Sequence, residues 1–171
     1  DYVVRGEGEW PLLELVEVLE GTREAEDVLG LGYKVNGIPK INTMRPLIED
    51  LDTLPLPAYD LVPMDLYGTS KLLFSPGGTT IHHSRGCTAS CSFCVWWTQM
   101  AHREEGEDGT IELRPRWRTK SVDRTMEEIE ELYYRYGKKC YVWVDESWNI
   151  DARWNDQFAD EVIRSGMDIT W

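Results

Sequence analysis

The sequence has no apolar run that approaches the roughly 18 residues needed to span a bilayer. It also lacks the charged start, apolar core and small-residue cleavage site of a signal peptide. These absences predict a protein with no membrane span and give no sign of export. With 42% hydrophobic side chains, the 171 residues can bury one ordinary core, or a small domain plus part of another.

Positive charge is scarce, since 18 Lys and Arg residues stand against 31 Asp and Glu, which gives a net charge of −13 at pH 7. Nucleic-acid binding depends on basic side chains that neutralise phosphates, so this balance argues against a nucleic-acid partner. The basic stretch at residues 114–120 is a local exception. It could meet a phosphate or carboxylate, or form a solvated strand edge.

Cysteine is also scarce, and its placement is informative. Cys87, Cys91 and Cys94 lie within eight residues, whereas the fourth cysteine, Cys140, lies in an apolar run. Such clustering suits a metal site in a reducing compartment better than a disulfide framework. We therefore expect a cytoplasmic metalloprotein.

The first half of the chain predicts a strand, a helix, a hairpin and a linker. Tyr2 to Val4 is a short β run, and the spacing of Leu12, Val16 and Leu19 predicts a helix that begins near Pro11. Asn36-Gly37 predicts a two-residue turn between short strands. Five prolines between positions 39 and 63 then forbid a long helix and favour an extended linker.

From residue 79 the order is strand, loop, helix, strand, helix, strand, which predicts parallel strands and an α/β fold. Ser121 and Asp151 are suited to begin the two helices, and residues 103–110 look like an exposed polar loop. The expected strands after residue 79 are 79–84, 140–144 and 167–171. The chain begins with Asp1 and has a strand pattern at both ends, so we expect a piece of a longer protein.

The stretch Arg85-Gly86-Cys87-Thr88-Ala89-Ser90-Cys91-Ser92-Phe93-Cys94 carries the chemistry. Three thiolates spaced by three and then two residues can bind three irons of a [4Fe–4S] cubane. The fourth iron is then open to a substrate or cofactor.

Two other metal sites compete with this interpretation. Structural zinc normally takes four protein ligands, which the three cysteines and His82, His83 or His102 could supply. A closed four-cysteine iron–sulfur centre would need Cys140, whose apolar surroundings favour burial.

The motif Cys-x3-Cys-x2-Cys after a strand, with Phe93 before the last cysteine, resembles that of the radical S-adenosylmethionine (SAM) superfamily. The wider sequence resembles the branch in which a Rossmann-like cobalamin-binding domain precedes the radical SAM barrel. That resemblance implies the end of a cobalamin domain at residues 1–30, a linker at 31–78 and the first β/α units of a partial barrel at 79–171. The narrower match is carried by residues 3–9, 51–61, 84–87 and 144–151.

The resemblance also implies an activity. Members bind SAM to the open iron and cleave it reductively to a 5′-deoxyadenosyl radical, and many then transfer a methyl group from methylcobalamin to an unactivated carbon. A reductant such as flavodoxin or ferredoxin is implied, and the substrate could be a peptide, a lipid or a small molecule. We expect a C-methyltransferase whose isolated piece is inactive. The alternatives are a cyclase or other oxidative enzyme of the same branch, and a zinc-stabilised α/β binding module without catalysis.

The resemblance assigns further residues to cofactors. Polar residues after the second barrel strand hold the SAM ammonium in this family, which implies Asp145, Glu146 and Ser147; a carboxylate suits this contact because it accepts charge-assisted hydrogen bonds. The alternative for both acids is a turn or a helix cap. Phe93 is expected beside the cluster. The turn that contains Arg5, Gly6 and Gly8 is expected to face the cobalamin nucleotide tail, or to be a plain tight turn.

Overall fold

The computed structural model describes residues 1–68 and 77–171, so residues 69–76 of the predicted linker lie outside the described part. The described residues form two compact units, one of residues 1–49 and 90–115 and the other of residues 50–89 and 116–171. Both helices and strands are present, which confirms the predicted α/β class. The domain limits predicted after residues 30 and 78 stay a prediction. None of the described helices is long and apolar enough to cross a membrane.

The first unit contains a three-stranded antiparallel sheet in the order β1–β2–β3. The predicted hairpin is present, since β2 and β3 pair in antiparallel register on either side of the turn. Asn36 and Gly37 adopt positive φ angles of 51° and 81°, as a type I′ turn requires. The strands are β1 (Val3–Val4), β2 (Leu31–Val35) and β3 (Ile38–Ile41).

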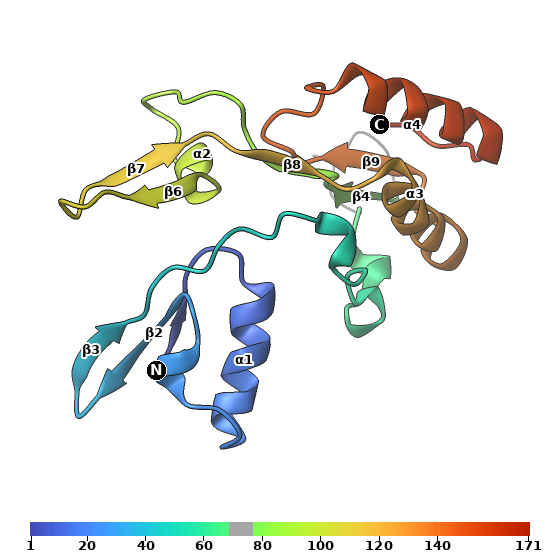
Figure 1. The fold of residues 1–171 in the computed structure, drawn as a ribbon. Coiled ribbons are helices and arrows are strands. Elements are labelled where there is room, and N and C mark those ends of the chain that lie inside the picture. Colours follow the sequence, from blue (N-terminus) through green and yellow to red (C-terminus); the bar gives the residue numbers. More distant parts are fainter. Residues whose placement is uncertain (69–76) are drawn as a thin grey trace. The chain divides into compact units, whose positions relative to one another are not determined.

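Helix α1 (Glu9–Leu19) lies beside this sheet, followed by the 3-10 turn η1 (Ala25–Asp27) (Figure 1). The helix confirms the sequence prediction, but its expected apolar stripe is not buried. Leu12, Val16 and Leu19 are 57%, 44% and 66% exposed, whereas Pro11 is buried.

The predicted polar loop at residues 103–110 is in fact a hairpin of β6 (His102–Glu105) and β7 (Ile111–Arg114), which follows the short helix α2 (Trp96–Gln99). Its strands are charged and exposed, so they lack the apolar alternation that marks most strands. Ion pairs support the hairpin instead, since Arg114 lies 3.0 Å from Glu104 and 3.3 Å from Glu112.

The second unit has a parallel pair of strands, β4 (Gly78–Ile81) and β9 (Cys140–Trp143), with helices α3 (Val122–Glu130) and α4 (Ala152–Ser165) beside it (Figure 1). This confirms the predicted parallel arrangement. The strand predicted at residues 167–171 is reduced to one parallel bridge, between Cys140 and Thr170. A second pair, β5 (Ser84–Gly86) and β8 (Trp117–Thr119), is antiparallel.

The helix ends follow their sequence signals. The Ser121 hydroxyl accepts a hydrogen bond from the Arg124 amide at the start of α3, and Asp151 accepts from the amides of two residues at the start of α4. Gly166 ends α4 in the left-handed conformation. The last turn of the α3 helix is a π-helical segment, η5 (Glu131–Arg135). The apolar faces of both helices enter the core, whose buried members include Ile81, Met126, Ile129, Leu132, Tyr141, Trp154, Phe158 and Val162.

The linker segment, defined here as residues 50–67, is folded onto the second unit. It contains three 3-10 turns, η2 (Leu51–Thr53), η3 (Tyr59–Leu61) and η4 (Met64–Leu66). Arg124 donates to the Leu54 carbonyl at 2.6 Å, and buried Lys138 donates to the carbonyls of Met64 and Tyr67 at 2.7 and 2.8 Å. The linker segment is therefore held in place through its main-chain oxygens, by Arg124 of α3 and by Lys138.

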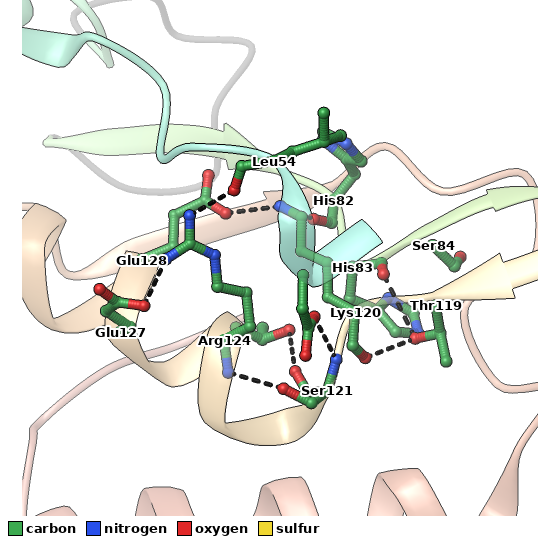
Figure 2. A network of polar contacts seen from close by, with 12 residues as sticks. Leu54, His82, His83, Ser84, Thr119, Lys120, Ser121, Arg124, Glu127 and Glu128 are labelled. Carbon is green, nitrogen blue, oxygen red and sulfur yellow. Dashed lines mark hydrogen bonds and ion pairs between the residues drawn. The ribbon is translucent and has the colours of Figure 1, made fainter. Parts of the chain in front are cut away.

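A buried ion pair lies beside the same segment, between Lys120 and Glu128 of α3. Lys120 Nζ lies 2.6 Å from Glu128 Oε2 and donates to the His82 carbonyl at 3.0 Å (Figure 2). The second oxygen of Glu128 accepts the hydroxyl hydrogen of Tyr59. Burial raises the pKa of Tyr59, and the charge of Glu128 raises it further, so this hydroxyl remains a donor.

We expect Glu128→Ala to destabilise the protein by about 3–5 kcal/mol, because it leaves the buried Lys120 ammonium without its counter-ion. The free energy of unfolding in urea measures this loss. Glu161→Ala is the matched control, because the partner of Glu161, Arg164, is 70% exposed; that change should cost less than about 1 kcal/mol. Equal losses in the two variants would show that the buried pair of Lys120 and Glu128 stabilises the protein no more than the exposed pair of Glu161 and Arg164.

Candidate functional site

The three clustered cysteines are free thiols that a metal can reach. Cys87 follows β5 directly, and the Cys94 amide donates to the Cys91 carbonyl at 3.1 Å, which closes a tight turn. Cys91 is exposed and the other two are half-buried. Cys140, by contrast, lies in β9 with 6% of its surface exposed, as its apolar neighbours predicted.

Cys87 belongs to the second compact unit, whereas Cys91 and Cys94 belong to the first. Among residues 1–68 and 77–171, no three His, Cys, Asp or Glu side chains already form a group that could hold a metal ion. The donor set still fits an iron–sulfur cluster chemically, because three accessible thiols without disulfide partners can all ionise and bind iron.

Two polar groups of the second unit lie against the Cys87 sulfur, and both can donate a hydrogen bond to a thiolate. The Ala89 amide donates to Cys87 Sγ at 3.4 Å, and the Ser147 hydroxyl oxygen is 3.9 Å from it. Hydrogen-bond donors beside a sulfur stabilise its thiolate, which is the form that binds metal. Ser147, one of the residues predicted to contact SAM, is thus placed next to the first cysteine.

Asp145 connects the end of β9 to the start of β5. Its Oδ1 accepts hydrogen bonds from the Ser84 amide at 2.6 Å, the His83 amide at 3.2 Å and the Ser84 hydroxyl. The His83 Nδ1 atom lies 2.8 Å from the same oxygen, and both side chains are 1% exposed or less. These contacts interrupt the strand predicted at 79–84, so the chain turns at His82 and His83 before it enters β5 and reaches Cys87.

His83 itself lies among indole rings. Its ring is 4.1 Å from that of Trp154 and 5.4 Å from that of Trp143, measured between centroids. Sequence analysis named His83 only as one of three candidate zinc ligands and missed its contact with Asp145; the one signal for a structural role is its position directly before Ser84 and the cysteine loop.

The zinc alternative gains no support from the histidines. His83 is buried against Asp145, and His102 is an exposed residue of β6 in the other unit from His82 and His83. Burial lowers the pKa of His82, and the charge of Lys120 lowers it further, so this imidazole stays neutral, the form that binds zinc. Among the described residues, none of the three histidines already forms a metal-binding group with the cysteines.

Comparisons with known proteins agree with the cysteine motif, although no family model matches the chain. The whole chain aligns with an uncharacterized methyltransferase of Pyrococcus horikoshii at 36% identity, over 34% of that protein. An anaerobic magnesium-protoporphyrin IX monomethyl ester cyclase of Cereibacter sphaeroides is 27% identical over 98% of the chain and 25% of the cyclase. The fold resembles that of OxsB, a cobalamin-dependent S-adenosylmethionine radical enzyme with aqua-cobalamin bound: the TM-score is 0.69 and the identity 21% over 98% of this chain and 22% of OxsB.

These similarities agree with the resemblance of the cysteine motif to the cobalamin-dependent branch of the radical SAM superfamily. The chain spans about a third or less of each of these relatives, so most of each relative lies outside the matched region.

The residues predicted to contact SAM differ in their availability. Glu146 is half-buried and has no hydrogen bond or ion pair among the described residues, so its carboxylate is free to accept an ammonium. The Asp145 side chain is fully buried and already accepts several hydrogen bonds. The SAM contact of all three residues stays a prediction, and the geometry favours Glu146 over Asp145 for it.

The remaining predicted site residues lie in the first unit. Phe93 is 90% exposed between the last two cysteines. Gly6 adopts a φ of +82° and lines a surface hollow together with Arg5. Gly8 lies at the start of α1, where its carbonyl accepts the Leu12 amide. Arg5 and Gly6 are thus brought together, whereas Gly8 does not line that hollow.

Asp145→Asn should destabilise the second unit by about 1–3 kcal/mol at neutral pH, because a neutral amide oxygen is a weaker acceptor for His83 and Ser84 than a carboxylate, and the amide nitrogen would be buried without an acceptor. Burial alone would raise the pKa of the Asp145 carboxyl, but the contacts with His83 and Ser84 outweigh burial, and the pKa lies below its ordinary value of 3.8. The charged form therefore stabilises the fold at pH values above about 4.

Urea denaturation of wild type and Asp145→Asn across a pH series measures this effect. The stability difference should be full above about pH 4 and should shrink as the pH falls through the lowered pKa. A difference that grows on acidification would mean that Asp145 is protonated in the native state.

Proposed function

We propose that the chain supplies the cluster-binding loop and part of the SAM site of a cobalamin-dependent radical SAM enzyme, most directly a C-methyltransferase. The observation that carries this proposal is the trio of accessible free thiols after β5, with an amide and a hydroxyl directed at the first of them. The identity of 36% with a methyltransferase, against 27% with a cyclase, favours methylation over cyclisation.

The residues of the chain have distinct tasks in this proposal. Cys87, Cys91 and Cys94 bind three irons as thiolates, and Ser147 supports the charge on Cys87. Glu146 accepts hydrogen bonds from the SAM ammonium, and Asp145 holds the strand that leads to Cys87. When bound, a [4Fe–4S] cluster supplies an open iron for SAM and the electron that cleaves it.

In this proposal the first unit supplies residues that contact cobalamin. Arg5 and Gly6 line a hollow, and a glycine with a φ of +82° permits a close approach of ligand and backbone there. Cobalamin, when bound, supplies the methyl group. A flavodoxin or ferredoxin supplies the electron. The substrate, a peptide, lipid or small molecule, would contact parts of the enzyme that relatives carry beyond the matched region.

Anaerobic reconstitution with iron and sulfide should give a brown protein with about four irons per chain. Cys87→Ala, Cys91→Ala and Cys94→Ala should each lose most of this iron and the paramagnetic signal of the reduced cluster, because a cubane with two protein ligands is not retained. Iron and sulfide assays with electron paramagnetic resonance provide the measurement.

Cys140→Ala is the matched control for these three variants, because it removes a buried thiol and should lower stability without loss of iron. Zinc in place of iron, or full iron content in any of the three variants, would defeat the proposal in favour of a zinc-stabilised binding module.

Glu146→Gln should weaken SAM binding to the reconstituted protein by about tenfold or more, which is the loss expected for one charge-assisted hydrogen bond. Equilibrium dialysis with labelled SAM measures it. Glu130→Gln, which removes an exposed carboxylate of α3, should leave the affinity unchanged. If Asp145→Asn weakened SAM binding while Glu146→Gln did not, the assignment of the ammonium to Glu146 would be wrong.

A further inference from the structure

The arginines of the first unit fall into two groups. Arg23 pairs with Glu17 at 2.7 Å, Arg45 pairs with Glu14, and Arg114 pairs with Glu104 and Glu112. The other two, Arg5 and Arg103, have no carboxylate partner among the described residues.

The hydrogen bonds that Arg5 and Arg103 make to described residues are long and go to main-chain carbonyls. Arg5 donates to the Asn42 carbonyl at 3.5 Å, and Arg103 donates to the Thr98 carbonyl at 3.4 Å. Both distances exceed the 2.9–3.0 Å that is usual for such bonds. Because a guanidinium has five N–H donors, most of the donors of Arg5 and Arg103 remain available to a ligand.

Arg5 and Arg103 line the same hollow, which has a volume of about 380 Å³ and no acidic residue in its lining. Gly6, Met44 and Gln99 also line it. An adjoining hollow shares Gly6, Met44, Gln99 and Arg103, and it contains Glu49 and the paired Arg45. In a chain with a net charge of −13, two arginines without carboxylate partners around an acid-free hollow form a local site for an anion.

The geometry of Gly6 keeps this hollow open. Its φ of +82° disfavours any other residue, and a Cβ atom there would lie 3.2 Å from Met44 Cε, inside the usual contact distance. The volume lies in the range of cofactor sites, and Met44 adds an apolar wall. A ligand that fits has a phosphate group for the two guanidinium groups and an organic body about as large as a nucleotide.

We propose that Arg5 and Arg103 bind the phosphate group of a nucleotide-like ligand in this hollow. The phosphate could belong to the nucleotide tail of cobalamin, in which case the inference rests on the proposed function and deepens it, or to a free phosphate ester. The site adds Arg103, from the strand that follows the cysteine loop, to the residue Arg5 that the sequence resemblance implied.

Calorimetric titration of the reconstituted protein with ADP, cobalamin and cobinamide, which lacks the nucleotide tail, tests the proposal. Arg5→Gln and Arg103→Gln should each weaken the binding of the phosphate-bearing ligand by about tenfold or more. Arg23→Gln, which loses the same charge in the same unit but faces Glu17, should leave it unchanged. Arg5→Lys and Arg103→Lys, which keep the charge but lose the planar fork, should also weaken binding and guard against misfolding of the glutamine variants.

Titrations with the three ligands distinguish the two sources of the phosphate. If the variants weaken cobalamin binding but leave cobinamide binding unchanged, the phosphate is that of the cobalamin tail. If they weaken only ADP binding, it is that of a free ester. If ADP and cobalamin both fail to bind, or bind equally well to wild type and all the arginine variants, the proposed site does not exist. Iron content should be the same in all of them, so failure here would leave the cluster proposal standing.

Discussion

The carboxylate of Asp145 is the contact on which the geometry of the second unit depends. Strand β4 ends at Ile81, whose carbonyl accepts the Val144 amide at 3.0 Å, and the next residues would continue outward from the sheet. Asp145 instead captures the amides of His83 and Ser84, so the chain bends into β5 and delivers Cys87 beside Ser147. One acceptor oxygen thereby holds the turn between β4 and β5, which leads to Cys87.

The surroundings of this contact make it rigid. Indole rings cover the His83 imidazole, and the Trp154 Nε1 atom donates to the Lys120 carbonyl at 2.9 Å. Lys120 in turn pairs with Glu128, and its amide donates to the His83 carbonyl at 2.7 Å. Aromatic packing, a buried ion pair and the carboxylate therefore all converge on the two residues before β5.

The sequence predicted the features that local chemistry decides. Ser121, Asp151 and Gly166 mark helix ends because capping needs only neighbouring backbone groups, and Asn36-Gly37 marks a turn because few other pairs tolerate two positive φ angles. The parallel strands followed from the order of elements.

The sequence did not reveal what distant residues decide. The hairpin of β6 and β7 was missed because its strands are held by charge pairs, although Asp108-Gly109 is a turn signal. The spacing of Leu12, Val16 and Leu19 predicted the helix α1 correctly, but an apolar pattern shows only which side could be covered, and these three side chains are exposed. The burial of Asp145 depends on donors about sixty positions earlier, which periodicity cannot show. The linker was expected to be extended and ordered by Leu and Tyr contacts; the linker segment does contact α3 through Tyr59, but polar contacts to its main chain also hold it there. Two of its cationic partners, Arg124 and Lys138, bind carbonyl oxygens, which every amino acid possesses. Homologues can therefore change the side chains at positions 54, 64 and 67 without loss of these bonds, whereas the two cations have no such freedom.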